Sequence, residues 1–216
     1  DLQKQVEKAR AEQRPVLMIV SVAGTTEMGD FDPIHEVDAY LKHLETSEGI
    51  HIWHHVDAAY GGFFCTLKTK ENPYISDSMR LAIKAIGSAN SITIDPHKLG
   101  YVPYSSGAFI TRTRKEYYLN KIHAPYLVIK DNDDKGPQTI EGSRSAAGAV
   151  STWLTSKTIG FNPNGYGRII ERTIKARVLL EKLLKEASPN IFTATFSKNK
   201  NSLLKHAQPD EPLSLN

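Results

Sequence analysis

The 216-residue chain has little cysteine and no long apolar run, and both features restrict what it can be. Its single cysteine, Cys65, cannot form a disulfide within the chain, which is typical of a reducing compartment. The longest apolar stretch, residues 16–23, is far shorter than the roughly 20 residues that a membrane-spanning helix needs. The first residues, 1–4, carry no apolar signal region. We therefore expect no membrane partner and a cytoplasmic location.

The sequence also lacks an excess of charge of one sign. It has 27 Lys and Arg residues against 24 Asp and Glu residues, for a net charge of +3, and the two signs are interleaved. A nucleic-acid-binding surface requires a basic stripe, and no such stripe is visible. Composition therefore predicts no nucleic-acid partner, and its 40% of hydrophobic residues suits one globular α/β domain.

Apolar runs alternate with amphipathic segments along most of the chain, which predicts an α/β fold with a largely parallel sheet. The nearly unbroken run at 16–22 is typical of a strand buried on both faces. Asp32 is predicted to cap a helix whose first residue is Pro33. The predicted strands are 16–22, 50–56, 91–94 and 106–111, and the predicted helices are 2–13, 34–44, 79–86, 140–159 and 164–187. Residues 1–187 are expected to form part of one large domain, and 188–216 the start of a small C-terminal domain or a disordered tail.

Polar side chains follow three of these strands, and ligands of open α/β sheets bind at the carboxyl ends of strands. Thr26 lies in the first of these loops, Asp57 in the second, and His97 with Lys98 in the third. We expect Asp57 and Lys98 to form an acid–amine pair at the bottom of a cleft.

An amine and a carboxylate at neighbouring strand ends are what pyridoxal 5'-phosphate (PLP) requires. A lysine holds the cofactor as a Schiff base, and a carboxylate keeps its pyridine nitrogen protonated. Lys98 and Asp57 are the candidates, and the small Ala58 and Ala59 leave room for a flat ring. Alone, Asp57 would more often be a turn residue and Lys98 a surface lysine, so the argument depends on their combination. His55 and its neighbour His54 are interpreted as structural, not as metal ligands, and no metal site is predicted.

Three motifs then carry a resemblance to a known family. The segments 55–62 (His-Val-Asp-Ala-Ala-Tyr-Gly-Gly), 95–98 (Asp-Pro-His-Lys) and 24–26 (Gly-Thr-Thr) resemble, in order and spacing, the motifs of group II PLP-dependent amino-acid decarboxylases. The resemblance covers residues 1–185. It implies an incomplete large domain of the PLP-dependent transferase-like fold (fold type I), with a mostly parallel sheet flanked by helices.

The resemblance also implies roles for individual residues. Lys98 would bind the cofactor covalently, and Asp57 would contact the pyridine nitrogen. Tyr126 matches a tyrosine on the family's mobile catalytic loop, which returns a proton to the substrate Cα after carbon dioxide leaves. The residues implied to line the cofactor are His97 beside it, Ala59 on one ring face and Thr26 at the ring edge.

Within the family, residues 100–107 and 140–147 are most similar to bacterial tyrosine decarboxylases. This implies decarboxylation of an L-amino acid, most simply tyrosine or another aromatic one, to the amine and carbon dioxide. It also implies a homodimer with shared active sites, in which Gly142 and Ser143 approach the partner's cofactor phosphate.

Two departures from the family pattern qualify these expectations. Asp95 stands where animal aromatic-amino-acid decarboxylases carry an asparagine near the phosphate. The family's upstream serine-containing phosphate loop and ring-stacking histidine have no counterpart, so we expect a fragment that cannot decarboxylate unaided. The alternatives are a glutamate or aspartate decarboxylase, an aldehyde lyase of the sphingosine-phosphate lyase type, and a non-catalytic dimerising remnant.

Overall fold

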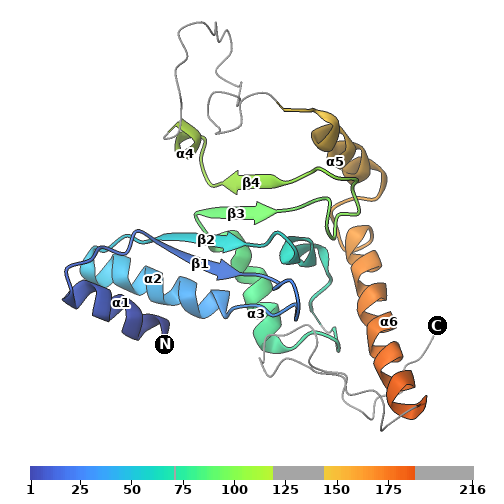
Figure 1. Ribbon diagram of the computed structural model, residues 1–216, viewed down its shortest axis with the longest axis horizontal. Coiled ribbons are helices and arrows are strands. Elements are labelled where there is room, and N and C mark those ends of the chain that lie inside the picture. The colour runs from blue at the N-terminus through green and yellow to red at the C-terminus, as the bar shows by residue number, and fades with distance from the viewer. Residues whose placement is uncertain (71, 119–143, 188–216) are drawn as a thin grey trace, which may run out of the picture.

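A four-stranded sheet organises the chain in the order β1-β2-β3-β4 (Figure 1). The computed structural model describes residues 1–70, 72–118 and 144–187. Strands β1 (Met18–Val22), β2 (Trp53–Asp57) and β3 (Ser91–Ile94) are parallel, and β4 (Ala108–Thr111) pairs with β3 in the antiparallel direction. The predicted α/β class with a mostly parallel sheet is confirmed, and its last strand is the exception.

Helices connect and flank these strands. The connection from β1 to β2 runs through α2 (Ile34–Glu48), and the connection from β2 to β3 runs through α3 (Asp77–Ala85). Each therefore serves as the crossover that a parallel strand pair needs. The other helices are α1 (Leu2–Ala11), α4 (Lys115–Tyr118), α5 (Ala147–Thr158), α6 (Tyr166–Ala187) and the short 3₁₀ segments η1 (Gly61–Thr66) and η2 (Ile86–Ser88). No helix in the described ranges is long and apolar enough to cross a membrane.

The hydrophobic core lies on one face of the sheet. Ile19 of β1 packs with side chains of α1 and α2, and Val56 of β2 packs with side chains of α2, α3 and η1. Alternate residues of a strand point to opposite faces. Met18 and Val20 consequently lie on the other face, where they are 51% and 53% exposed. The prediction that the 16–22 run is buried on both faces is wrong for the described part of the chain, because the helices cover one face only.

Two local expectations also need correction. Pro33, not Asp32, occupies the N-cap of α2, because the Asp32 carboxylate accepts a hydrogen bond from Val22 N at 2.7 Å instead. That bond ties the loop back to the end of β1. The helix expected at 140–159 begins at Ala147 in the structure, where 144–146 are not helical.

The long helix α6 is held against the sheet layer by its first turns. Tyr166 and Ile170 are fully buried in the main core, and Ile174 is 8% exposed. The hydroxyl of Tyr166 donates to the carbonyl of Gly100 at 2.5 Å. Figure 1 shows α6 at the end of the sheet toward which β1, β2 and β3 point. The segment 188–216, expected to start a second domain or a tail, lies outside the described residues.

Candidate active site

The loops that follow the three parallel strands meet at one edge of the sheet. In the strand register, Asp57 lies opposite Val22 on one side and Thr93 on the other. The loops beyond the strands stay joined, because Asp95 N donates to Ala59 O at 3.1 Å and Gly61 N donates to Ala23 O at 2.9 Å. This edge therefore gathers the loops of Thr26, Asp57 and Lys98, which lie 31 and 41 positions apart along the chain.

Lys98 pairs with a different carboxylate from the one expected. Its Nζ lies 3.1 Å from Oδ2 of Asp95, and its side chain is 37% exposed. The backbone explains this pairing: Lys98 N donates to Asp95 O at 2.9 Å, so a turn places the two side chains together. The predicted direct pair of Lys98 with Asp57 at the bottom of a cleft is thus wrong in the described residues. The sequence signal for the actual pair was the i, i+3 spacing of Asp95 and Lys98.

His97 is held by its neighbours in a defined tautomer. Its Nδ1 accepts a hydrogen bond from Ser106 N at 3.1 Å, so the ring hydrogen of the neutral form is on Nε2. That Nε2 lies 3.7 Å from Asp95 Oδ2. The ring also contacts that of Tyr104, with the centroids 4.2 Å apart. Asp95 therefore lies between the amine of Lys98 and the imidazole of His97.

Asp57 is half-buried at the end of β2 and keeps acceptor capacity. Its Oδ1 accepts from Ala59 N at 3.1 Å. A carboxylate has about four acceptor positions on two oxygens, so one backbone bond leaves Asp57 able to bind a protonated ring nitrogen.

His55 supports the same face of the sheet as Asp57. Its Nδ1 lies 2.7 Å from Ser91 Oγ, its Nε2 lies 3.2 Å from Thr93 Oγ1, and its ring stacks on Phe109. Burial lowers the pKa of His55, and the charge of Asp57 opposes this shift. Both ring nitrogens have protein partners, in keeping with the structural role expected for this histidine.

The remaining predicted site residues differ in their exposure and in whether the structure describes them. Thr26 is exposed in the loop after β1, where its neighbour Thr25 accepts from Asp30 N at 2.9 Å. Ala59 is half-buried and adjoins Asp57. Tyr126, Gly142 and Ser143 lie outside the described residues.

The donor set at this edge fits PLP. An amine, a carboxylate with spare acceptor capacity and an imidazole lie in loops joined by the Asp95–Ala59 hydrogen bond. Ala59 adds a small side chain against which a flat ring can lie. Lys98 would hold the aldehyde carbon, and Asp57 would contact the ring nitrogen.

Comparison with known proteins agrees with this donor set. The model of the pyridoxal-dependent decarboxylase conserved domain matches residues 1–202. The chain belongs to this family. The family is pyridoxal-dependent, which confirms the predicted cofactor.

Several curated members of the family are similar in sequence. The L-tyrosine decarboxylase of Levilactobacillus brevis is 36% identical over 194 residues, covering 78% of this chain and 31% of that protein. The L-tyrosine decarboxylase of Enterococcus faecium is 31% identical, covering 86% of this chain and 34% of that protein. The aspartate 1-decarboxylase of Aliivibrio fischeri is 39% identical, covering 81% and 29%. The chain thus spans about a third of the length of these relatives.

Solved structures show the same fold. Mouse CSAD in its apo form superposes with a TM-score of 0.69 at 24% identity, covering 86% of this chain and 36% of that one. Oryza sativa TDC with PLP and tryptamine gives a TM-score of 0.63 at 18% identity, covering 90% and 38%. These similarities confirm the fold type I assignment.

Proposed function

We propose that this chain carries the cofactor-binding core of a PLP-dependent L-amino-acid decarboxylase, with tyrosine or another aromatic amino acid as substrate. The observation that carries the proposal is that Asp57 ends β2 while His97 and Lys98 lie in the loop that follows the neighbouring parallel strand β3. When bound, the cofactor supplies a cationic ring that accepts the electron pair left on Cα as the carboxylate departs.

Each residue has a separate task in this proposal. Lys98 provides the amine that holds the cofactor, and Asp95, 3.1 Å away, orients that amine. Asp57 keeps a proton on the ring nitrogen by placing a negative charge beside it. His97 offers its Nε2 hydrogen toward the space shared with Asp95. Tyr126, as a proton donor to Cα, and Thr26, at the ring edge, complete the predicted set.

Covalent capture of the cofactor tests the first of these tasks. The full chain is incubated with PLP, reduced with borohydride and digested, and the modified peptide is located by mass spectrometry. We expect the label on Lys98 and its loss in Lys98→Ala, with Lys115→Ala as a control in the exposed helix α4. Labelling of Lys98→Ala at the wild-type level would contradict the assignment.

The identity of the substrate is a separate part of the proposal. The two L-tyrosine decarboxylases support an aromatic substrate, whereas the 39% identity to an aspartate 1-decarboxylase supports an acidic one as the second candidate. Carbon dioxide release by the full-length gene product is measured with L-tyrosine, L-aspartate and L-glutamate. We expect kcat/KM to be largest for L-tyrosine. Release from the acidic substrates alone would select the second candidate.

The same assay separates the remaining alternatives. An aldehyde product without carbon dioxide indicates the lyase chemistry of the sphingosine-phosphate type. Cofactor capture without any turnover indicates a non-catalytic remnant.

We also propose a cytoplasmic homodimer with shared active sites and the division into 1–187 and 188–216. Sedimentation of the full-length gene product, fractionation of its cells and limited proteolysis test these points. A monomer with full activity would contradict the shared site.

A further inference from the structure

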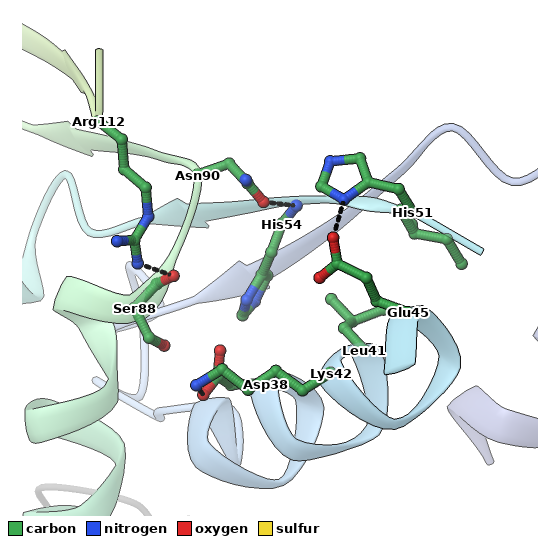
Figure 2. Close-up of a pocket in the computed structure, with 10 residues that line it drawn as sticks. Asp38, Leu41, Lys42, Glu45, His51, His54, Ser88, Asn90 and Arg112 are labelled. Atoms are coloured by element: carbon green, nitrogen blue, oxygen red, sulfur yellow. Dashed lines mark hydrogen bonds and ion pairs between the residues drawn. The ribbon is translucent and has the colours of Figure 1, made fainter. Parts of the chain in front are cut away.

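A polar pocket lies at the opposite end of the sheet from Lys98. Its volume is about 330 Å³, which is within the range of small-molecule sites. Residues at the amino ends of β2 and β3 line it, together with one side of α2 and Arg112, which follows β4 (Figure 2). The lining residues are Asp38, Leu41, Lys42, Glu45, His51, Ile52, His54, Ser88, Asn90 and Arg112, and none belongs to the candidate active site.

One buried histidine in this pocket has an unsatisfied nitrogen. His54 is 3% exposed, and its Nε2 lies 2.9 Å from Ser21 Oγ, but its buried Nδ1 has no hydrogen-bond partner. Figure 2 shows the imidazole extending from its strand toward the helix that carries Asp38. Burial lowers the pKa of His54, against the opposing charge of Asp38. A neutral imidazole can donate or accept at Nδ1, so either a cationic or an anionic ligand group can satisfy it.

The pocket presents a cationic side chain on one wall. Arg112 is fixed by carbonyls in and just after η2, since its Nε donates to Ala89 O at 3.1 Å and its Nη2 donates to Gly87 O at 3.3 Å. A further bond goes to Ser88 O (Figure 2). Across the ranges that the structure describes, no carboxylate forms an ion pair with Arg112. Its positive charge is therefore oriented by the backbone and not neutralised.

The opposite wall, formed by α2, presents carboxylates. Asp38 pairs with Lys42 at 2.7 Å, and Glu45 pairs with His51 at 3.2 Å. The basic partners are at the rim, where the side chain of Lys42 is 64% exposed and that of His51 is 56% exposed. Exposed ion pairs of this kind are weak, so Asp38, whose side chain is 17% exposed, can still accept from a ligand.

We propose that this pocket binds a small zwitterion of the α-amino-acid type, with its carboxylate at Arg112 and its ammonium at Asp38. A zwitterion matches the opposite charges of the two walls, whereas a simple anion would meet Asp38 and Glu45, and a simple cation would meet Arg112. His54 lines the same pocket, and its Nδ1 would gain from the ligand the hydrogen-bond partner that the described residues do not supply. The proposal does not depend on the function assigned to the Lys98 site.

The test uses the ring signals of His54 in the cofactor-free full chain labelled with ¹³C-histidine. L-Alanine is titrated as the zwitterion, and acetate and ethylammonium are the matched half-ligands. We expect a saturable shift with L-alanine at a dissociation constant at least about tenfold below either half-ligand, because two charged contacts replace one. Arg112→Gln and Asp38→Asn should each weaken binding about tenfold, and Arg114→Gln, outside the lining, should leave it unchanged.

Circular dichroism checks that each variant folds. Asp38→Asn decides the test if Arg112→Gln unfolds, because Asp38 belongs to the exposed pair with Lys42 and not to the backbone contacts of η2. No saturable shift, equal affinities for L-alanine and acetate, or unchanged binding in Asp38→Asn would overturn the proposal.

Discussion

Asp95 and Asp57 interact with different side chains at the candidate active site. Asp95 lies within 3.1 Å of the Lys98 amine and 3.7 Å of the His97 imidazole. In the part of the chain that the structure describes, Asp57 forms no hydrogen bond or ion pair with either group, and its charge acts instead on His55. Two carboxylates at one sheet edge thus serve different partners, which leaves Asp57 available for a ring nitrogen.

The effect of Asp57 on His55 gives a prediction at the residue scale. The carboxylate raises the pKa of His55 against the larger effect of burial, which lowers it. Replacing Asp57 by Asn removes the raising charge, so the pKa of His55 should fall further below its usual 6.5. A pH titration of the histidine ring signals by NMR measures this shift. Asp77→Asn, in a side chain that is 92% exposed on α3, is the control. A rise in the pKa of His55 in Asp57→Asn would contradict the electrostatic assignment.

At the scale of elements, η1 is packed too closely to the end of β1 for any side chain at its first residue. A Cβ on Gly61 would lie 2.2 Å from the carbonyl oxygen of Ala23 and 2.6 Å from Phe31 Cζ. The same glycine donates its N–H to that carbonyl at 2.9 Å. This close approach joins the loop that follows β1, which contains Thr26, to the loop that follows Asp57.

The Gly61 contact predicts a large cost for a small substitution. Gly61→Ala should destabilise the chain by roughly 1–3 kcal/mol, because the backbone must shift to relieve the overlap. Gly87→Ala is the matched control, since a Cβ there meets nothing within 4 Å. It should change stability by less than about 1 kcal/mol, in the stabilising direction. Urea denaturation followed by circular dichroism measures both, and equal stability of the two variants would show that the close approach is relieved without cost.

At the scale of the whole molecule, α6 connects the C-terminal part of the described chain to the site. Tyr166 is fully buried and bonds the carbonyl of Gly100, two residues beyond Lys98. Its ring also packs on Phe63 and Phe161, with centroids 5.3 Å away in each case. Helix α6, which lies nearly 70 residues later in the sequence, therefore packs against the loop that carries Lys98 and stabilises it.

Removing one hydroxyl tests this long-range support. Tyr166→Phe keeps the ring contacts but leaves the buried carbonyl of Gly100 without its donor, which should cost about 1–3 kcal/mol of stability. Hydrogen exchange should also accelerate at the amides of α6. Leu180→Gln, at a position that is 56% exposed on the same helix, should change stability by no more than about 0.5 kcal/mol. Thermal denaturation and hydrogen exchange are measured on both variants. Equal stability and equal exchange in the two would show that the Tyr166 hydrogen bond does not stabilise this packing.

The local pattern of the sequence was enough to predict the strand–helix alternation and the three polar loops, whereas the roles of Lys98 and Asp57 stay predictions. Such features depend on the period of apolar residues and on short motifs, both of which are visible within a window of about 20 residues. The direction of β4, the exposure of Met18 and Val20 and the pairing of Lys98 with Asp95 were not predicted. Each depends on which segments lie beside one another, and residue spacing alone does not report that.

Tertiary structure alone also decided the polar pocket around His54. Its lining comes from α2, the amino ends of β2 and β3 and the residue after β4, and no motif links these segments. The sequence by itself thus placed the polar residues of the candidate site after the parallel strands. The partners of these residues, and the pocket around His54 at the far end of the sheet, were decided by packing, because burial and opposing charge arise only when distant segments are brought into contact.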